Sequence, residues 1–214
     1  MGGEETKAVA EIAKATGELA KTSGKVVDAS TSFGSWLSKT LGTIPEDLLG
    51  IAGGDWVHEQ RKRNLISLQA KTAEIRTRID AGPPQEPSVS VILPLLRAAS
   101  DEARPELQSL WAGLLTAALQ PDGGRRVRRA YFETLTLMEP MDAVLFEAIM
   151  HERQDKKGGR VDVNLVGGKA EIGGDERTVS INALEKLGLI VFGTHDGLHT
   201  VKPYGLAFWE ACNP

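Results

Sequence analysis

Apolar residues in segment 107–118 recur at the spacing of an α-helix, and this pattern constrains the fold more than any other feature of the chain. They occupy positions i, i+3, i+4, i+7, i+8 and i+11, which are Leu107, Leu110, Trp111, Leu114, Leu115 and Ala118. Side chains at this spacing lie on one face of a helix, which must be buried against other elements. The sequence therefore predicts a core helix over 101–119, capped by Ser100 or Asp101 and preceded by a shorter helix over 91–99.

A second helical pattern covers residues 56–80, where an apolar seam is flanked by Lys and Arg. The seam has the three-four spacing of a coiled coil and consists of Leu65, Leu68, Thr72, Ile75 and Ile79. Such a helix packs along another long helix, in the same chain or in a second copy. The stretch from Gly82 to Pro87 contains three prolines and cannot be helical, so we expect an internal linker there.

Residues 1–55 predict two weaker helices, over about 8–19 and 25–41. Seven glycines between Gly17 and Gly54 make these helices marginal, so we expect that they are stable only when docked on another surface. Charged residues recur throughout residues 1–22, which fits neither a signal peptide nor a membrane span. We therefore expect a cytoplasmic location.

The pattern changes again after Pro140. A short helix to about His151, a Gly-rich segment over 158–174 and a helix over 178–187 precede two β-prone runs, at 189–192 and 198–201, and a closing helix over 204–212. Helix, helix, two-stranded wing and helix is the winged-helix order. We predict a mainly α fold, with a multi-helix N-terminal and middle region (1–82 and 83–139) and a C-terminal winged-helix-like α+β module (140–214). One helix is expected over 125–138, and a hairpin between the glycine pairs 167–168 and 173–174.

Charge separates two hypotheses for the C-terminal module. Residues 141–214 contain 8 Lys and Arg against 11 Asp and Glu, and the expected recognition helix offers only Lys186, which Glu185 offsets. A DNA-reading helix needs cations that reach phosphates. The sequence therefore favours a protein-docking or purely structural module, with a DNA-binding transcriptional regulator as the alternative.

No catalytic constellation emerges from the residue pattern, so we expect a non-enzymatic protein without metal or cofactor. The chain lacks a Gly-rich phosphate loop ending in Lys-Ser or Lys-Thr and a Gly-x-Ser-x-Gly elbow. His195 and His199 have no third metal ligand at suitable spacing, which favours a titrating or exposed pair over a zinc site. The single cysteine, Cys212, is predicted to be a small buried hydrophobe.

Two basic clusters leave alternatives open. One consists of Arg61, Lys62 and Arg63, and the other of Arg125, Arg126, Arg128 and Arg129 at an expected helix start. Both suit phosphate groups of nucleic acid, nucleotide or anionic lipid, but a solvated or subunit-facing surface is the simpler interpretation. The carboxylates Asp101 and Glu102 are interpreted as helix capping.

The segment 23–56 is rich in apolar residues, including Phe33, Trp36, Leu37 and Trp56. It suits either the protein core or a membrane-perturbing region. We favour the core, because membrane-surface helices usually carry a Lys/Arg-rich polar face and this segment has none. A membrane surface therefore stays an alternative partner on activation.

The chain resembles the abortive-infection alpha family of bacterial proteins over residues 54–212. The resemblance lies in "GDWVHEQRKRN", "VILPLLRAASDEARPELQSLWAGLLTAAL", "FETLTLMEPMDAVLFEAI", "ALEKLGLI" and "VKPYGLAFWEAC", while the polar insert at 158–177 departs from it. It implies a role in defence against phage, in which infected cells arrest or die. The positions it singles out for interaction or helix packing are Asp55, Arg61, Arg63, Asn64, Glu106 and Trp111. We expect a homo-oligomer or another protein as partner.

Overall fold

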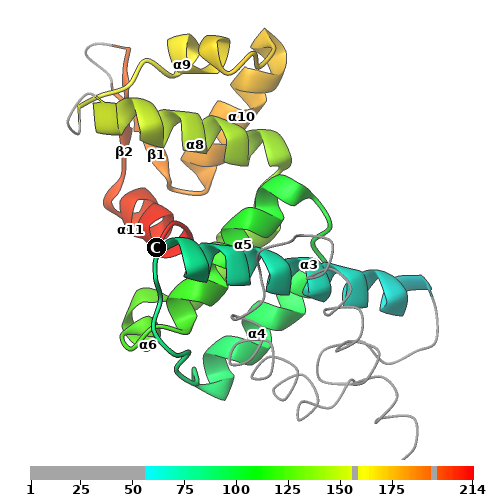
Figure 1. Cartoon of the computed structure of the whole chain (residues 1–214). Coiled ribbons are helices and arrows are strands. Elements are labelled where there is room, and N and C mark those ends of the chain that lie inside the picture. Colours follow the sequence, from blue (N-terminus) through cyan, green and yellow to red (C-terminus); the bar gives the residue numbers. More distant parts are fainter. Residues whose placement is uncertain (1–55, 156–158, 194–196) are drawn as a thin grey trace, which may run out of the picture. The chain divides into compact units, whose positions relative to one another are not determined.

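The computed structural model describes residues 56–155, 159–193 and 197–214, in which the chain is mainly α-helical with one two-stranded antiparallel sheet (Figure 1). The predicted mainly α fold class is thereby confirmed. The described chain divides into two compact units, the first ending at Phe132 and the second covering 133–213. The helices expected within residues 1–55 lie outside the described residues.

The first unit is built around two long helices. Helix α3 (Trp56–Arg78) packs on α5 (Pro105–Ala118), and α4 (Val89–Ser100) contacts both. Leu65, Leu68 and Thr72 of the predicted seam are buried, while Ile75 and Ile79 are half-buried. The predicted long helix is confirmed, and its helical partner lies in the same chain. The proline-rich stretch after it is non-helical, as predicted.

Helix α5 is buried on more sides than its apolar stripe predicts. All residues from Trp111 to Leu119 are buried, including Gly113 and Thr116, which lie off the stripe. The small side chains at 112, 113, 117 and 118 let neighbouring elements approach closely. An apolar helix with this burial pattern is the centre of a core.

Two predicted helix boundaries in this unit are wrong. Helix α5 begins at Pro105 rather than at residue 101, and its N-cap is Arg104 in an extended conformation, not Ser100 or Asp101. Pro105 explains this start, because proline disfavours helical geometry in the preceding residue and suits the first helical position. The helix predicted over 125–138 is interrupted: α6 (Gly123–Arg126) ends before Val127, whose backbone is extended and side chain buried, and α7 (Arg129–Leu137) follows.

The second unit contains α8 (Pro140–Asp155), α9 (Val163–Lys169) and α10 (Gly174–Lys186), then β1 (Ile190–Phe192), β2 (His199–Val201) and α11 (Pro203–Cys212). The two strands pair antiparallel, with Ile190 opposite Val201. A bridge joins Val161 to His199, so β2 has a partner on both sides. The predicted hairpin and closing helix are confirmed.

The hairpin predicted between the glycine pairs at 167–168 and 173–174 is wrong. Residues 163–169 form helix α9, whose N-cap Asp162 accepts the Leu165 backbone N–H through Oδ1 at 3.1 Å. Gly167 serves close packing rather than a turn, because a Cβ there would lie 2.3 Å from Cδ of Arg177 on α10. A glycine pair thus marks the contact between two helices.

Aromatic rings fill the core of the second unit. Phe146 of α8 lies 6.0 Å from both Phe208 and Trp209 of α11, measured between ring centroids. Cys212 is buried, as predicted, and burial raises the pKa of its thiol well above the usual value. The helix α11 also passes close to the chain at Leu189, which accepts the Lys202 backbone N–H at 2.9 Å.

Trp56 departs from its expected place in the core. It is the first residue of α3, and its side chain is 78% exposed to solvent. The indole therefore contributes little buried apolar area to the first unit. The remaining positions of the apolar segment 23–55 lie outside the described residues.

Substitution of Gly205 tests the close approach of α11. A Cβ at this position would lie 2.3 Å from the Leu189 carbonyl oxygen. We expect Gly205→Ala to lower the free energy of unfolding by about 1–3 kcal/mol, because backbone must move to relieve the overlap. The control is Gly174→Ala, at the start of α10 with no atom within 4 Å of the added Cβ, and it should leave stability unchanged or raise it. Equal urea midpoints for Gly205→Ala and wild type would contradict the packing.

Candidate functional site

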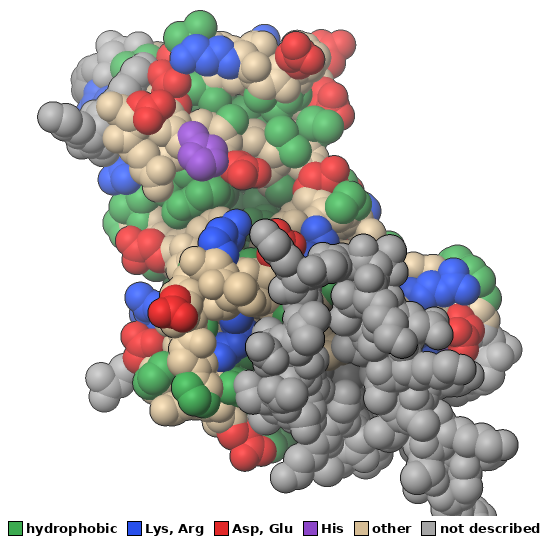
Figure 2. Space-filling view, viewed as in Figure 1, with side chains coloured by type: hydrophobic (Ala, Val, Ile, Leu, Met, Phe, Trp, Pro, Cys, Tyr) green, Lys and Arg blue, Asp and Glu red, His purple; other side chains and the backbone are tan. Residues whose placement is uncertain are grey.

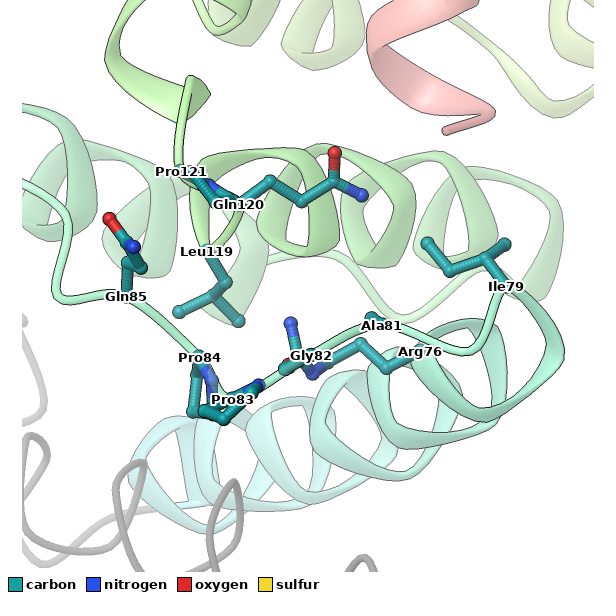
Figure 3. Close-up of a pocket in the computed structure, with 10 residues that line it drawn as sticks. All are labelled: Arg76, Ile79, Ala81, Gly82, Pro83, Pro84, Gln85, Leu119, Gln120 and Pro121. Atoms are coloured by element: carbon teal, nitrogen blue, oxygen red, sulfur yellow. The ribbon is translucent and has the colours of Figure 1, made fainter.

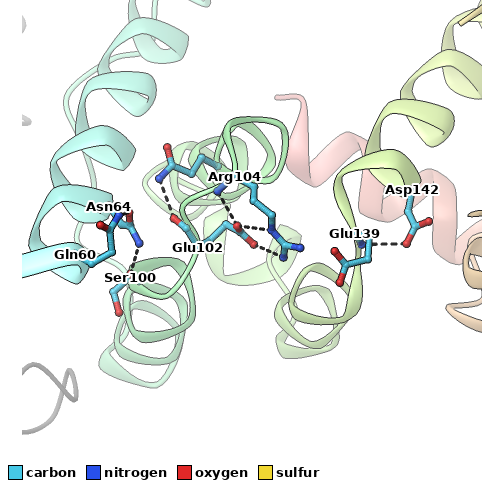
Figure 4. A network of polar contacts seen from close by, with 8 residues as sticks. Gln60, Asn64, Ser100, Glu102, Arg104, Glu139 and Asp142 are labelled. Carbon is cyan, nitrogen blue, oxygen red and sulfur yellow. Dashed lines mark hydrogen bonds and ion pairs between the residues drawn. The ribbon is translucent and has the colours of Figure 1, made fainter. Parts of the chain in front are cut away.

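A polar junction joins α3 to the connection between α4 and α5. Buried Asn64 donates from Nδ2 to the Ser100 carbonyl oxygen at 2.8 Å and accepts from Gln60 Nε2 at 3.0 Å (Figure 4). One turn further along α3, Ser67 Oγ donates to Gln108 Oε1 at 2.6 Å. Because unsatisfied polar groups are costly inside a protein, these bonds fix where α3 lies.

The connection itself is folded around Glu102. Its Oε1 accepts from the Arg104 backbone N–H at 2.8 Å and from Arg104 Nε at 2.9 Å, and Oε2 accepts from Nη2 at 2.9 Å. Gln108 Nε2 donates to the Glu102 carbonyl oxygen at 2.8 Å. Burial alone raises the pKa of Glu102, but the hydrogen bonds and charge of Arg104 outweigh it, so the pKa lies below its usual value. The carboxylate therefore stays ionised as a structural element.

Asp101 and Glu102 do not cap α5, contrary to the sequence interpretation. Glu102 binds Arg104, and Asp101 Oδ1 lies 2.6 Å from Arg61 Nε of α3. The short connection over 101–104 explains the difference, because it separates both carboxylates from the helix start at Pro105.

Of the six positions that the family resemblance singled out, the five that the structure describes lie in different surroundings. Arg61 and Asn64 lie in the polar junction, and Trp111 is buried in the core with its ring 6.0 Å from that of Phe132. Arg63 and Glu106 are exposed. The sixth position, Asp55, lies outside the described residues. The side chains with clear contacts serve helix packing, and the described ones do not converge on one cleft.

The second arginine cluster spans two helices instead of starting one. Arg126 lies 3.1 Å from Asp122 and donates to Gln120 at 3.0 Å, while Arg129 at the start of α7 donates to the Ser90 carbonyl oxygen at 3.2 Å. Arg128 is exposed. The side chain of Arg125 lies outside the described part of the chain. Two of these guanidinium groups thus take part in local structure.

A pocket of about 500 Å³ lies between the end of α3, the proline-rich loop and the end of α5 (Figure 3). It is lined by Arg76, Ile79, Ala81, Gly82, Pro83, Pro84, Gln85, Leu119, Gln120 and Pro121. Sequence reasoning missed it, because its two halves are about forty residues apart in the chain. The sequence feature that could have indicated it is the presence of proline in both halves, Pro83 and Pro84 in one and Pro121 in the other. We interpreted the first of these stretches only as a linker.

His199 occupies the middle of the small sheet. Its Nε2 lies 3.8 Å from Glu185 Oε1, its ring centroid lies 5.3 Å from that of Phe192, and its buried Nδ1 has no hydrogen-bond partner. Burial lowers the pKa of His199, and the charges of Glu185 and Asp162 oppose that shift without cancelling it. His199 is therefore buried, and the predicted alternative of an exposed histidine is wrong for it. His195 lies outside the described residues.

The outward surface of α10 and β1, here called the α10 surface, combines apolar and acidic side chains. Val179 is 67% exposed, and Val191 and Phe192 are 46% and 50% exposed. Exposed Asp175 and Glu176 occupy the first turn of α10, and its other exposed residues are Gly174, Thr178, Asn182 and Lys186. On the face seen in Figure 2, basic side chains of the second unit are isolated spots among acidic and apolar ones.

The described residues contain no cluster of three or more His, Cys, Asp or Glu that could hold a metal ion. None of their helices combines the length and the apolar character that crossing a membrane requires.

Comparison with known proteins gives one match. A family model described as abortive infection alpha matches residues 60–212, which is more than two thirds of the chain and includes residues of both units. No curated protein and no solved structure matches.

Replacement of Asn64 tests the polar junction. Asn64→Leu leaves the buried Ser100 carbonyl without its donor, so we expect the free energy of unfolding to fall by about 1–3 kcal/mol. Asp101→Asn is the matched control, because it removes only a half-exposed ion pair and should cost at most about 1 kcal/mol. Urea unfolding measures both. An equal loss in the two variants would show that the junction contributes no more than a surface pair.

The burial of His199 predicts a pH dependence of stability. Because folding lowers the pKa of His199, the unfolded chain takes up the proton first, and stability falls as the pH drops below about 6.5. We expect His199→Phe to flatten the decline in unfolding free energy between pH 7 and pH 5. Above pH 7 the difference between variant and wild type should stay constant. Parallel curves over the whole range would contradict the assignment.

Proposed function

The chain belongs to the abortive infection alpha family, and on this basis we propose that it acts in bacterial defence against phage through protein–protein contact rather than by catalysis. The partner is another protein or a second copy of the chain. The family match agrees with the resemblance in the sequence.

The α10 surface is the observation that carries this proposal. An exposed valine in the middle of a helix, next to a strand with exposed Val191 and Phe192, leaves apolar area in water. Apolar and aromatic side chains inside a polar rim are typical of protein-binding surfaces. Exposed Asp175 and Glu176 lie on the same helix as Val179, which favours a partner with cationic or neutral groups over a phosphate backbone.

Polar groups elsewhere support a non-catalytic role. In the first unit the buried Asn64, Gln108 and Glu102 are engaged in bonds between helices or within a connection. A catalytic group needs a polar atom directed at substrate, with a base or donor within hydrogen-bond reach. The hydrogen bonds of these side chains go to other parts of the protein, which suits a role in holding the helices in place.

DNA binding by a winged-helix module is the second candidate, favoured by the order of elements. Helix α8, the bridge at Val161, helices α9 and α10, and the β1–β2 hairpin follow one another as in a winged helix. Helix α10 corresponds to the recognition helix, but its exposed face offers one cation, Lys186, against two carboxylates. A gel-shift series at low ionic strength tests this candidate, and salt-sensitive binding to its own promoter region would support it.

The substitution Val179→Lys distinguishes the two candidates. It places a charge in the apolar part of the α10 surface, so it should weaken protein docking, whereas an added lysine on a recognition helix should keep or strengthen DNA binding. We expect native-level expression of wild type to reduce plaquing, with culture collapse only at high multiplicity. Val179→Lys should lose this protection, measured on the same phage panel.

Leu137→Lys is the matched control. Leu137 is 69% exposed at the end of α7, where a cation suits the helix dipole. This variant should protect as wild type does. Protection by Val179→Lys at the wild-type level, in a folded protein, would overturn the docking proposal, and wild type that protects against no phage in the panel would overturn the defence role.

A further inference from the structure

We propose that the partner of the α10 surface is a second copy of the chain, and that the two copies pair antiparallel through one exposed stripe of α10. This inference rests on the proposed docking function and names the partner of the same surface. The stripe consists of Asp175, Val179, Asn182 and Lys186, all of which are exposed. All four residues belong to the second unit.

The spacing of the stripe places its members on one face of the helix. They follow one another at steps of four, three and four residues, the spacing at which side chains form a row along a helix. The opposite face contains buried Ser180 and Leu184, and also Arg177, whose side chain lies against α9. The stripe therefore faces away from the side on which α10 packs.

The stripe has opposite charges at its two ends. Asp175 lies in the first turn of α10 and Lys186 in the last, about 16 Å apart along the axis at the standard helical rise. Both positions suit the helix dipole. Neither side chain has a hydrogen-bond or ion-pair partner among the described residues. A partner helix with the reversed order of charges can therefore pair with both ends.

A second copy of α10 supplies that reversed order when it runs antiparallel. In such a pair, residues whose numbers add to the same sum face each other, so Asp175 faces Lys186 of the second copy and Val179 faces Asn182. Because a two-fold axis repeats every contact, the dimer contains two pairs of Asp175 with Lys186. A parallel pair would place like charges together at both ends, which is destabilising.

Val179 supplies the apolar contact at the centre of this interface. It lies next to the two-fold axis, so the two valines, each 67% exposed in the single chain, cover one another. Asn182 beside them is polar, and a polar residue between paired helices restricts their register. Exposed Phe192 lies beside the end of α10, because its backbone N–H donates to Glu185 Oε1 at 3.0 Å. An interface of this small size predicts a weak, reversible dimer.

The test is sedimentation equilibrium of the full chain over a concentration series, with charge reversals at the two ends of the stripe. We expect wild type to form a reversible dimer. Asp175→Lys and Lys186→Asp should each raise the dissociation constant about tenfold, because each turns two attractive pairs into two repulsive ones. The matched control is Glu210→Lys, an equal change of charge at an exposed position of α11, and it should dimerise as wild type does.

A mixture of the two reversed variants separates pairing from misfolding. Combined in equal amounts, Asp175→Lys and Lys186→Asp restore two pairs of opposite charge, so a heterodimer should form although each variant alone dimerises weakly. A variant that had lost its fold would not be rescued in this way. Absence of a wild-type dimer at the highest soluble concentration, dimers of wild-type strength in both variants, or no heterodimer in the mixture would each overturn the proposal.

Failure of this inference is distinguishable from failure of the proposed function. Loss of protection in Val179→Lys together with a monomeric wild type would support docking of a different protein and overturn the second copy as partner. A wild-type dimer and a rescued heterodimer, together with full protection by Val179→Lys, would support the antiparallel pair and overturn the role of the α10 surface in defence.

Discussion

The first unit depends on the burial of α5. A helix enclosed over nine consecutive positions, Trp111 to Leu119, leaves room only for neighbours that approach closely, and α3 is one of the helices packed against it. Apolar contacts alone tolerate sliding of one helix along another, since oily surfaces are not directional. The bonds of Asn64 to Ser100 and of Ser67 to Gln108 are directional, and they select one register. The loop after α3 is then delivered to the end of α5, where the pocket forms.

In the second unit, two glycines allow neighbouring elements to pack closely, because they have no side chain at the contact. Gly167 lets the Arg177 side chain cross α9, and Gly205 lets α11 approach the backbone at Leu189. These two approaches hold α10 and α11 around a sheet of only two short strands, which would be marginal by itself. His199 lies at the centre of that sheet and is used on both edges, through pairing with Phe192 and with Val161. Because its ring is buried, protonation of His199 opposes folding of this sheet.

The spacing of apolar residues predicted the long helices of this fold correctly. The stripes of α3 and α5 and the hairpin with its closing helix follow from residue spacing, because burial of one face dictates that spacing. Local sequence failed where a long-range contact decides the outcome. Val127 is buried and has an extended backbone where the predicted helix breaks. In α9, Gly167 lies against the Arg177 side chain of α10, a contact that the local pattern does not reveal. The candidate site residues show the same limit: the apolar stripe predicted that Trp111 is buried, but the family pattern singled out Asn64 without indicating that it is buried too.

The distribution of polar groups connects structure and function in this chain. Buried hydrogen-bonding groups that face one another across helices contribute specificity to a fold, and such groups are unsuited to chemistry because their donors and acceptors are occupied. Apolar groups in water have the opposite consequence, since covering Val179 and Phe192 with a partner releases free energy that the isolated chain leaves unused. The two kinds of group are separated along the chain, because the polar junction that fixes α3 lies in the first unit and the α10 surface lies in the second.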